Sequence, residues 1–180
     1  MIEFIYDSQK YENTFIRCMN DYDEYYWATS WCGDNFHAYQ TLLNNKSKIK
    51  LLATGAYDND GHPIISKEFI ANFWEKGGAV HILGKIKWET GNKYGKGTNP
   101  IHTKVYIFYS DEKNFEGFIG SANFTKNGFE NYYEAMIHFN QDSVNNQQLR
   151  SLFEKVLSCN ELSEDVITKR IMRYGNRNNK

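Results

Sequence analysis

The sequence predicts an α/β fold in which helices flank one mixed β-sheet. In the first half of the chain, segments with a buried-strand pattern alternate with helical segments, and in the second half three strand segments follow one another. The 180 residues are 41% hydrophobic and 16% aromatic, which is enough apolar side chain for one core. We therefore expect residues 1–180 to form a single domain, with room for a short helical extension over residues 160–180.

The first half of the chain is expected to contribute three helices and three strands. The helices are predicted at residues 11–20, 35–43 and 67–76, and the strands at residues 25–31, 48–54 and 79–83. Ser66 is the expected N-cap of the third helix, and Gly77 and Gly78 are its expected end.

The second half is expected to supply three consecutive strands, at residues 101–109, 117–122 and 132–139. Residues 110–116 have the composition of a hairpin connection between the first two. An apolar stripe at helical spacing predicts a helix over residues 145–157, and a shorter helix is expected over residues 163–170.

Composition excludes several classes of protein. No apolar run reaches about 18 residues, so no membrane segment is expected. The N-terminus has neither the cationic start nor the apolar stretch of a secretory signal. The three cysteines form no Cys-x-x-Cys pair and are odd in number, which predicts a cytoplasmic protein rather than a disulfide scaffold.

Positive charge gathers in one stretch, although the formal net charge of the whole chain is only −1. Residues 75–104 hold six lysines against two glutamates, with glycines between them. Such a segment can attract a polyanion, and it can equally be a solvated loop. If it binds DNA, the residues expected to make contact are Lys85, Lys87, Trp88, Lys93 and Lys96.

The side chains that can carry chemistry are concentrated between residues 102 and 134. On an extended segment His102 and Lys104 share one face, which places a nucleophile or proton carrier beside a cation. Ser121 and Asn123 likewise share a face and add short polar donors, and Glu134 supplies a carboxylate. If the three strands are neighbours, this set suits attack on a phosphate ester, whose charged oxygens need donors and cations.

Order and spacing together resemble the signature of the phospholipase D superfamily. The resemblance is to its small bacterial members with one motif per chain and to its metal-independent restriction endonucleases. It is carried by His-x-Lys, then Gly-Ser-x-Asn, then a glutamate eleven residues after the asparagine, at His102, Lys104, Gly120, Ser121, Asn123 and Glu134.

The resemblance implies a phospholipase D-like fold and a metal-independent endonuclease that needs no cofactor. Family members bring two His-x-Lys motifs to one site, and this chain has one, so the resemblance implies a homodimer with a shared active site. One His102 would form a phosphohistidine while the other protonates the leaving oxygen. DNA is the expected substrate, in a restriction or defence system. A phosphatidyl transferase or phospholipase, and a non-catalytic DNA-binding module, remain the alternatives.

The sequence departs from the family pattern at one position. The family's aspartate five residues after the lysine is replaced by Tyr109, which favours the restriction endonuclease branch because its members also lack that aspartate. Members of this branch that recognise a sequence usually carry a further recognition domain, so an additional recognition domain or partner subunit is expected unless loops read the DNA.

Two other histidines, His37 and His138, are weaker candidates for chemistry. His37 lies close to Cys32 in sequence, but no further ligands accompany the pair, so no metal site is predicted there. His138 lies within an apolar strand segment and is expected to be a packed or hydrogen-bonded core residue.

Overall fold

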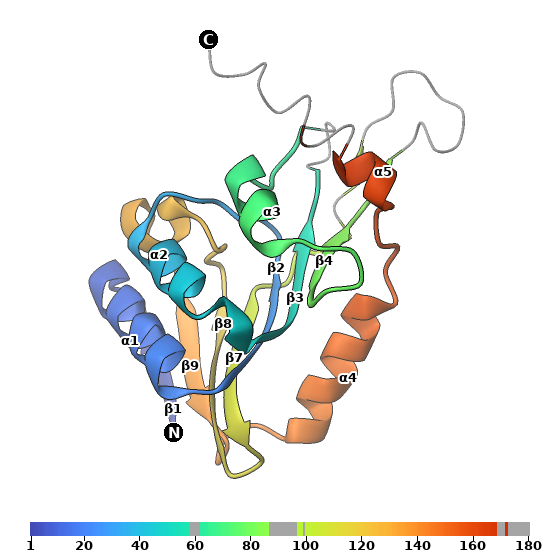
Figure 1. The fold of residues 1–180 in the computed structure, drawn as a ribbon. Coiled ribbons are helices and arrows are strands. Elements are labelled where there is room, and N and C mark those ends of the chain that lie inside the picture. The colour runs from blue at the N-terminus through green and yellow to red at the C-terminus, as the bar shows by residue number, and fades with distance from the viewer. Residues whose placement is uncertain (58–61, 87–96, 99, 169–171, 173–180) are drawn as a thin grey trace.

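A seven-stranded mixed sheet forms the centre of the molecule, and helices cover both of its faces (Figure 1). The computed structural model describes residues 1–57, 62–86, 97–98, 100–168 and 172. Strand order across the sheet is β1-β9-β8-β7-β2-β3-β4. The β2, β3 and β4 strands are parallel, whereas β7, β8, β9 and β1 continue the sheet in antiparallel pairs.

The seven strands of this sheet are β1 (Ile2–Ile5), β2 (Glu24–Thr29), β3 (Ile49–Gly55), β4 (Val80–Leu83), β7 (Val105–Asp111), β8 (Asn114–Gly120) and β9 (Met136–Asn140). A separate two-stranded ribbon consists of β5 (Lys85–Ile86) and β6 (Gly97–Thr98). The α-helices are α1 (Ser8–Asp21), α2 (His37–Asn44), α3 (Lys67–Phe73), α4 (Asn146–Leu157) and α5 (Glu164–Val166). A 3₁₀ turn spans Lys46–Lys48, and a π-helical turn spans Asn127–Asn131.

Side-chain alternation along the strands divides the apolar residues into two cores. In β2, Tyr25 and Trp27 point toward α1, α2 and α3, whereas Ala28 belongs to the core on the α4 side. The first core is unusually aromatic: Phe15 of α1 lies 5.2 Å from Trp27 and 4.9 Å from Phe108, measured between ring centroids. Burial of these rings fixes α1 on the sheet.

The predicted fold class is confirmed, and the boundaries of several elements were wrong. β1 was missed because Ile2 and Phe4 are exposed on an edge strand, which leaves a weak pattern of alternation. The α3 helix does begin after a Ser66 cap, whose hydroxyl accepts from the Phe69 amide at 2.9 Å. It ends at Phe73 rather than at Gly77, because the chain turns extended at Trp74. None of the helices in the described ranges is long and apolar enough to span a membrane.

The three late strands are displaced relative to the predicted ranges. The β7 strand begins at Val105, β8 ends at Gly120 and β9 begins at Met136. The predicted chemical residues therefore lie just outside the strands instead of alternating along them. The reason is the register, in which Val105 pairs with Ile119 and Gly120 with Met136, so the ladder closes at these pairs.

One edge of the sheet collects these strand ends. β2 and β8 finish there, and the antiparallel β7 and β9 begin there. Across this edge, in strand order, lie the segment after β2, the segment before β7, the segment after β8 and the segment before β9. We call it the upper edge, and it brings residues far apart in sequence within reach of one another.

Candidate active site

The upper edge brings together all five predicted catalytic side chains. His102 and Lys104 precede β7, Ser121 and Asn123 follow β8, and Glu134 precedes β9. These three strands are neighbours in the sheet, as the chemistry required. Backbone hydrogen bonds tie the segments together, from Gly120 N to Lys104 O at 3.2 Å and from Ser121 N to Ala135 O at 3.1 Å.

His102 and Lys104 form the cationic part of the site. The imidazole of His102 is exposed, whereas Lys104 is only 7% exposed. Lys104 Nζ donates to the His102 carbonyl at 3.0 Å and lies 3.5 Å from His102 Nδ1. Burial lowers the pKa of Lys104, and the negative charge of Glu134 partly offsets that effect. A buried ammonium beside an accessible imidazole is suited to holding a phosphate oxygen.

Ser121 and Glu134 form the second part. The Ser121 hydroxyl donates to Glu134 Oε2 and accepts from the Ala135 amide at 3.0 Å, so its orientation is fixed. The family resemblance implies that Glu134 accepts from the ring of a His102 in the assembled site. The hydrogen bond that the structure gives this carboxylate goes to Ser121 instead, within a single chain.

Asn123 brings an amide to the same edge. Its Oδ1 is buried and has no hydrogen-bond partner among the described residues. A buried acceptor without a partner is costly, and in a native structure it is typical of a position that contacts a ligand or a water molecule. Gly128 of the π-helical turn packs directly on the Asn123 backbone, where a Cβ atom would collide with the Asn123 carbonyl. Glycine is therefore required for this approach.

Buried hydroxyl groups behind the site hold this segment, and the sequence reasoning missed them. The Tyr106 hydroxyl donates to the Ala122 carbonyl at 2.9 Å and lies within hydrogen-bond distance of Thr29 Oγ1, at 3.0 Å. Thr29 Oγ1 in turn accepts from the Phe124 amide at 3.3 Å. The backbone is thus anchored on both sides of Asn123. In the sequence Tyr106 is one of several aromatic residues in an apolar strand segment, and the pattern of that segment gives no indication of this role.

The basic stretch can be placed only by its ends. It leaves the sheet at β4, whose last residue lies at the upper edge, and returns at Ile101 beside His102. Lys85 begins β5. Lys87, Trp88, Lys93 and Lys96 lie outside the described residues, so their proposed DNA contacts stay predictions.

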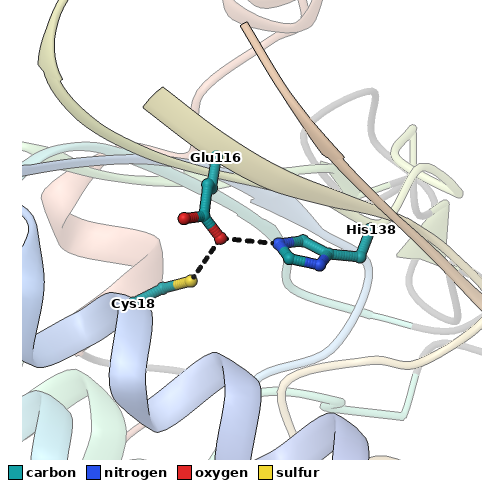
Figure 2. A group of neighbouring side chains, drawn as sticks. All are labelled: Cys18, Glu116 and His138. Atoms are coloured by element: carbon teal, nitrogen blue, oxygen red, sulfur yellow. Dashed lines mark hydrogen bonds and ion pairs between the residues drawn. The ribbon is translucent and has the colours of Figure 1, made fainter. Parts of the chain in front are cut away.

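A second cluster of titratable side chains lies below the site, between α1 and the sheet (Figure 2). Glu116 Oε2 receives His138 Nε2 at 2.7 Å and Cys18 Sγ at 3.5 Å. Arg17 Nη2 contacts the same oxygen at 2.5 Å, and the Tyr22 hydroxyl donates to Oε1 at 2.9 Å. His138 is buried and hydrogen-bonded, as predicted.

The donor atoms of Cys18, Glu116 and His138 lie close enough together to suggest a metal site, but their chemistry does not fit one. Donors occupy both oxygens of Glu116, and one of those donors is a guanidinium that repels a cation. Burial raises the pKa of Cys18, with the charge of Glu116 adding to it, so the thiol stays protonated. The cluster is therefore a structural network that joins α1 to β8 and β9.

Comparison with known proteins identifies the family. Residues 34–168 match the model of the NgoFVII restriction endonuclease N-terminal PLD domain, PLD standing for phospholipase D. The chain belongs to this phospholipase D family. A search of curated proteins found no match.

Two solved structures share the fold of this phospholipase D family member. NucT from Helicobacter pylori has a TM-score of 0.60 and 24% identity, and the match covers 90% of this chain and 99% of NucT. Nuc from Salmonella typhimurium, a phospholipase D family member, has a TM-score of 0.57 and 14% identity, with 90% and 97% of the two chains covered. At these identities the comparison establishes the fold.

The upper edge of this phospholipase D family member carries an exposed imidazole, a buried ammonium, an amide and a serine bonded to a glutamate. An imidazole can attack phosphorus, and a buried ammonium and an amide can hold the non-bridging oxygens. The carboxylate of the serine–glutamate pair can orient a neighbouring side chain by accepting a hydrogen bond. A single chain nevertheless offers one His-x-Lys histidine, whereas displacement at phosphorus with an acid for the leaving group needs two such groups.

Proposed function

We propose that this protein is an endonuclease that hydrolyses phosphodiester bonds of DNA through a phosphohistidine intermediate and without a metal ion. The observation that carries the proposal is the position of Lys104 Nζ, 3.5 Å from the exposed His102 imidazole, on the edge that also holds Ser121, Asn123 and Glu134. The matched family is described as a restriction endonuclease PLD domain, and the structural neighbour Nuc is described as a phospholipase D family member.

The first step breaks the bond between phosphorus and the leaving oxygen. His102 attacks with the lone pair of a neutral ring nitrogen and forms a nitrogen–phosphorus bond, while His102 of the partner subunit gives its proton to the leaving oxygen. In the second step the partner histidine, now neutral, removes a proton from water. The water oxygen attacks phosphorus and releases His102.

The remaining side chains stabilise the charge on the phosphoryl group. Lys104 and Asn123 of both chains would bind the non-bridging oxygens, and Ser121 would add a hydrogen bond. Glu134 would accept from a ring N–H of His102 in the assembled site and so fix its tautomer. Because ammonium groups from two chains supply the positive charge, the proposed mechanism has no step that requires a divalent cation.

An exposed apolar row supports a homodimer with a shared site. Phe4 of β1 pairs in register with Ile137 of β9, and Ile137 pairs with Ile119 of β8, so their side chains lie on one face of the sheet. Phe4 is 70% exposed, Ile119 is 42% exposed and the neighbouring Ile2 is 63% exposed. The α4 helix covers the other half of this face. Ile119 is two residues from Ser121, so a second copy packed on this row would bring its own His102 toward the site.

We further propose a restriction or defence role in the cytoplasm, resting on the family match. Sequence recognition would then come from an additional recognition domain or partner subunit, or from the basic stretch after β4.

Incubation of the purified protein with supercoiled plasmid in excess EDTA tests the proposal. Nicking and linearisation should proceed in chelator, and His102→Ala and Lys104→Met should each lower the rate at least about 100-fold. The matched control is Lys126→Met, because Lys126 is an exposed lysine near the site whose ion pair with Glu130 has no proposed role. Activity lost in EDTA and restored by magnesium would contradict the mechanism. Cleavage of phosphatidylcholine but not of plasmid would identify a lipase, and DNA binding without cleavage would identify a binding module.

A further inference from the structure

The segments after β2 and before β9 carry three exposed aromatic residues, on either side of the proposed phosphate site. Trp31 is 45% exposed, Tyr132 is 58% exposed and the side chain of Tyr133 is fully exposed. We call these residues the aromatic rim. Each ring of the rim carries a polar group, a hydroxyl in the two tyrosines and an N–H in the indole of Trp31. The apolar row of Ile2, Phe4 and Ile119 has no such groups.

Strand order sets their position relative to the catalytic groups. Trp31 follows β2, and the backbone of the next residue, Cys32, bridges to Phe124 beside Asn123. Tyr132 and Tyr133 directly precede Glu134, which is bonded to Ser121. The segment before β7, with His102 and Lys104, and the segment after β8, with Ser121 and Asn123, therefore lie between the two parts of the rim.

The width of the rim is that of a few nucleotides. Three strand spacings separate β2 from β9, or about 14 Å, since neighbouring strands lie about 4.8 Å apart. Tyr132 is also held in place, because its hydroxyl accepts from Asn127 Nδ2 at 3.2 Å. A ring that is held beside the proposed phosphate site and is more than half exposed is suited to stacking on a base.

We propose that Trp31, Tyr132 and Tyr133 form a stacking surface for unpaired bases on both sides of the scissile phosphate. This inference rests on the proposed nuclease function and names its substrate class. Bases inside a duplex are stacked on one another and cannot meet these rings, so the surface selects single-stranded DNA or a locally opened duplex. Stacking on an aromatic side chain is tolerant of sequence, because every base presents a flat face.

The test measures binding of a labelled single-stranded oligonucleotide to the full-length His102→Ala chain by fluorescence anisotropy. The oligonucleotide is compared with one that carries abasic residues at its central positions but has the same phosphates. Tyr133→Leu should weaken binding of the intact strand about tenfold, which corresponds to about 1.4 kcal/mol and lies within the usual range for one stacked base. The same variant should leave binding of the abasic strand unchanged. Tyr133→Phe, which keeps the ring, is the matched control and should bind both strands as the parent chain does.

The outcomes separate this inference from the proposed function. Equal losses on intact and abasic strands, no loss at all, or a Tyr133→Leu chain that dissociates into monomers would each overturn the stacking surface. Plasmid cleavage by the wild-type chain in EDTA would still stand in those cases. Conversely, a ring-dependent preference for intact strands in a chain that cleaves no DNA would support the rim and contradict the nuclease.

Discussion

Tyr106 shows how a single buried hydroxyl can act on a site that it does not line. Its side chain is fully buried, and its bonds to Ala122 and Thr29 fix the segment that presents Asn123. Burial raises the pKa of Tyr106 far above its ordinary value, so the hydroxyl remains a donor at any working pH. We regard Tyr106 as a positioning residue.

Removal of the Tyr106 hydroxyl should therefore lower kcat, whereas its effect on the unfolding free energy should be no larger than that of removing another buried hydroxyl. Tyr106→Phe is expected to lower kcat for plasmid cleavage about tenfold with little change in KM, because small displacements of a catalytic amide are costly. Tyr25→Phe is the matched control, since the buried Tyr25 hydroxyl also donates to a carbonyl, that of Met19, but lies away from the upper edge. Both variants should lose about 1 kcal/mol of unfolding free energy. Equal kcat values for the two variants would contradict the positioning role.

Among the elements, α1 depends on the network around Glu116. Arg17, Cys18 and Tyr22 reach this β8 carboxylate from α1 and its C-cap, and His138 reaches it from β9. Burial opposes ionisation of Glu116, but the hydrogen bonds from His138, Arg17 and Tyr22 outweigh it and hold its pKa well below the ordinary 4.5.

A depressed carboxyl pKa makes stability fall in acid. Above pH 4.5 Glu116 is ionised in both the folded and the unfolded chain, and the full stabilisation is present. Below that pH the unfolded chain takes up the proton first, so the stabilisation is lost progressively as pH falls toward the folded pKa. We expect Glu116→Gln to lower the unfolding free energy by about 2 kcal/mol at pH 7, measured by urea denaturation. At pH 3 the unfolding free energies of the variant and the wild type should differ by less. A difference independent of pH would contradict this account of the network.

The elements also show what the sequence could and could not predict. Helix and strand identities followed from apolar periodicity, because burial on one face imposes it. The candidate site residues were predicted from their types and spacing. The alternation argument placed them on strands, whereas they lie on the segments just beyond the strand ends. Where a ladder closes depends on register between strands distant in sequence, such as Gly120 with Met136, and no local pattern encodes it. For the same reason Glu116 and Arg17, 99 residues apart, were not expected to meet.

At the scale of the whole molecule, the apolar row predicts where a second copy binds. Phe4→Asp places a charge at a β1 position whose side chain is 70% exposed, so the fold should tolerate it. We expect it to raise the dimer dissociation constant at least about tenfold in analytical ultracentrifugation and to reduce cleavage at low protein concentration. The control is Leu157→Asp, because Leu157 is 40% exposed at the end of α4, away from the row. A Phe4→Asp chain that dimerises like wild type would place the interface elsewhere.

The central claim is that two chains build one site, and mixing active with inactive chains tests it most directly. Wild-type protein and His102→Ala are combined in equal amounts under conditions that allow subunit exchange, and plasmid cleavage is followed in EDTA. With random pairing about a quarter of the dimers keep both histidines, so activity per wild-type chain should fall to about half of that in the unmixed sample. Activity that follows the number of wild-type chains without loss, or full activity in a monomer isolated by sizing, would contradict a shared site.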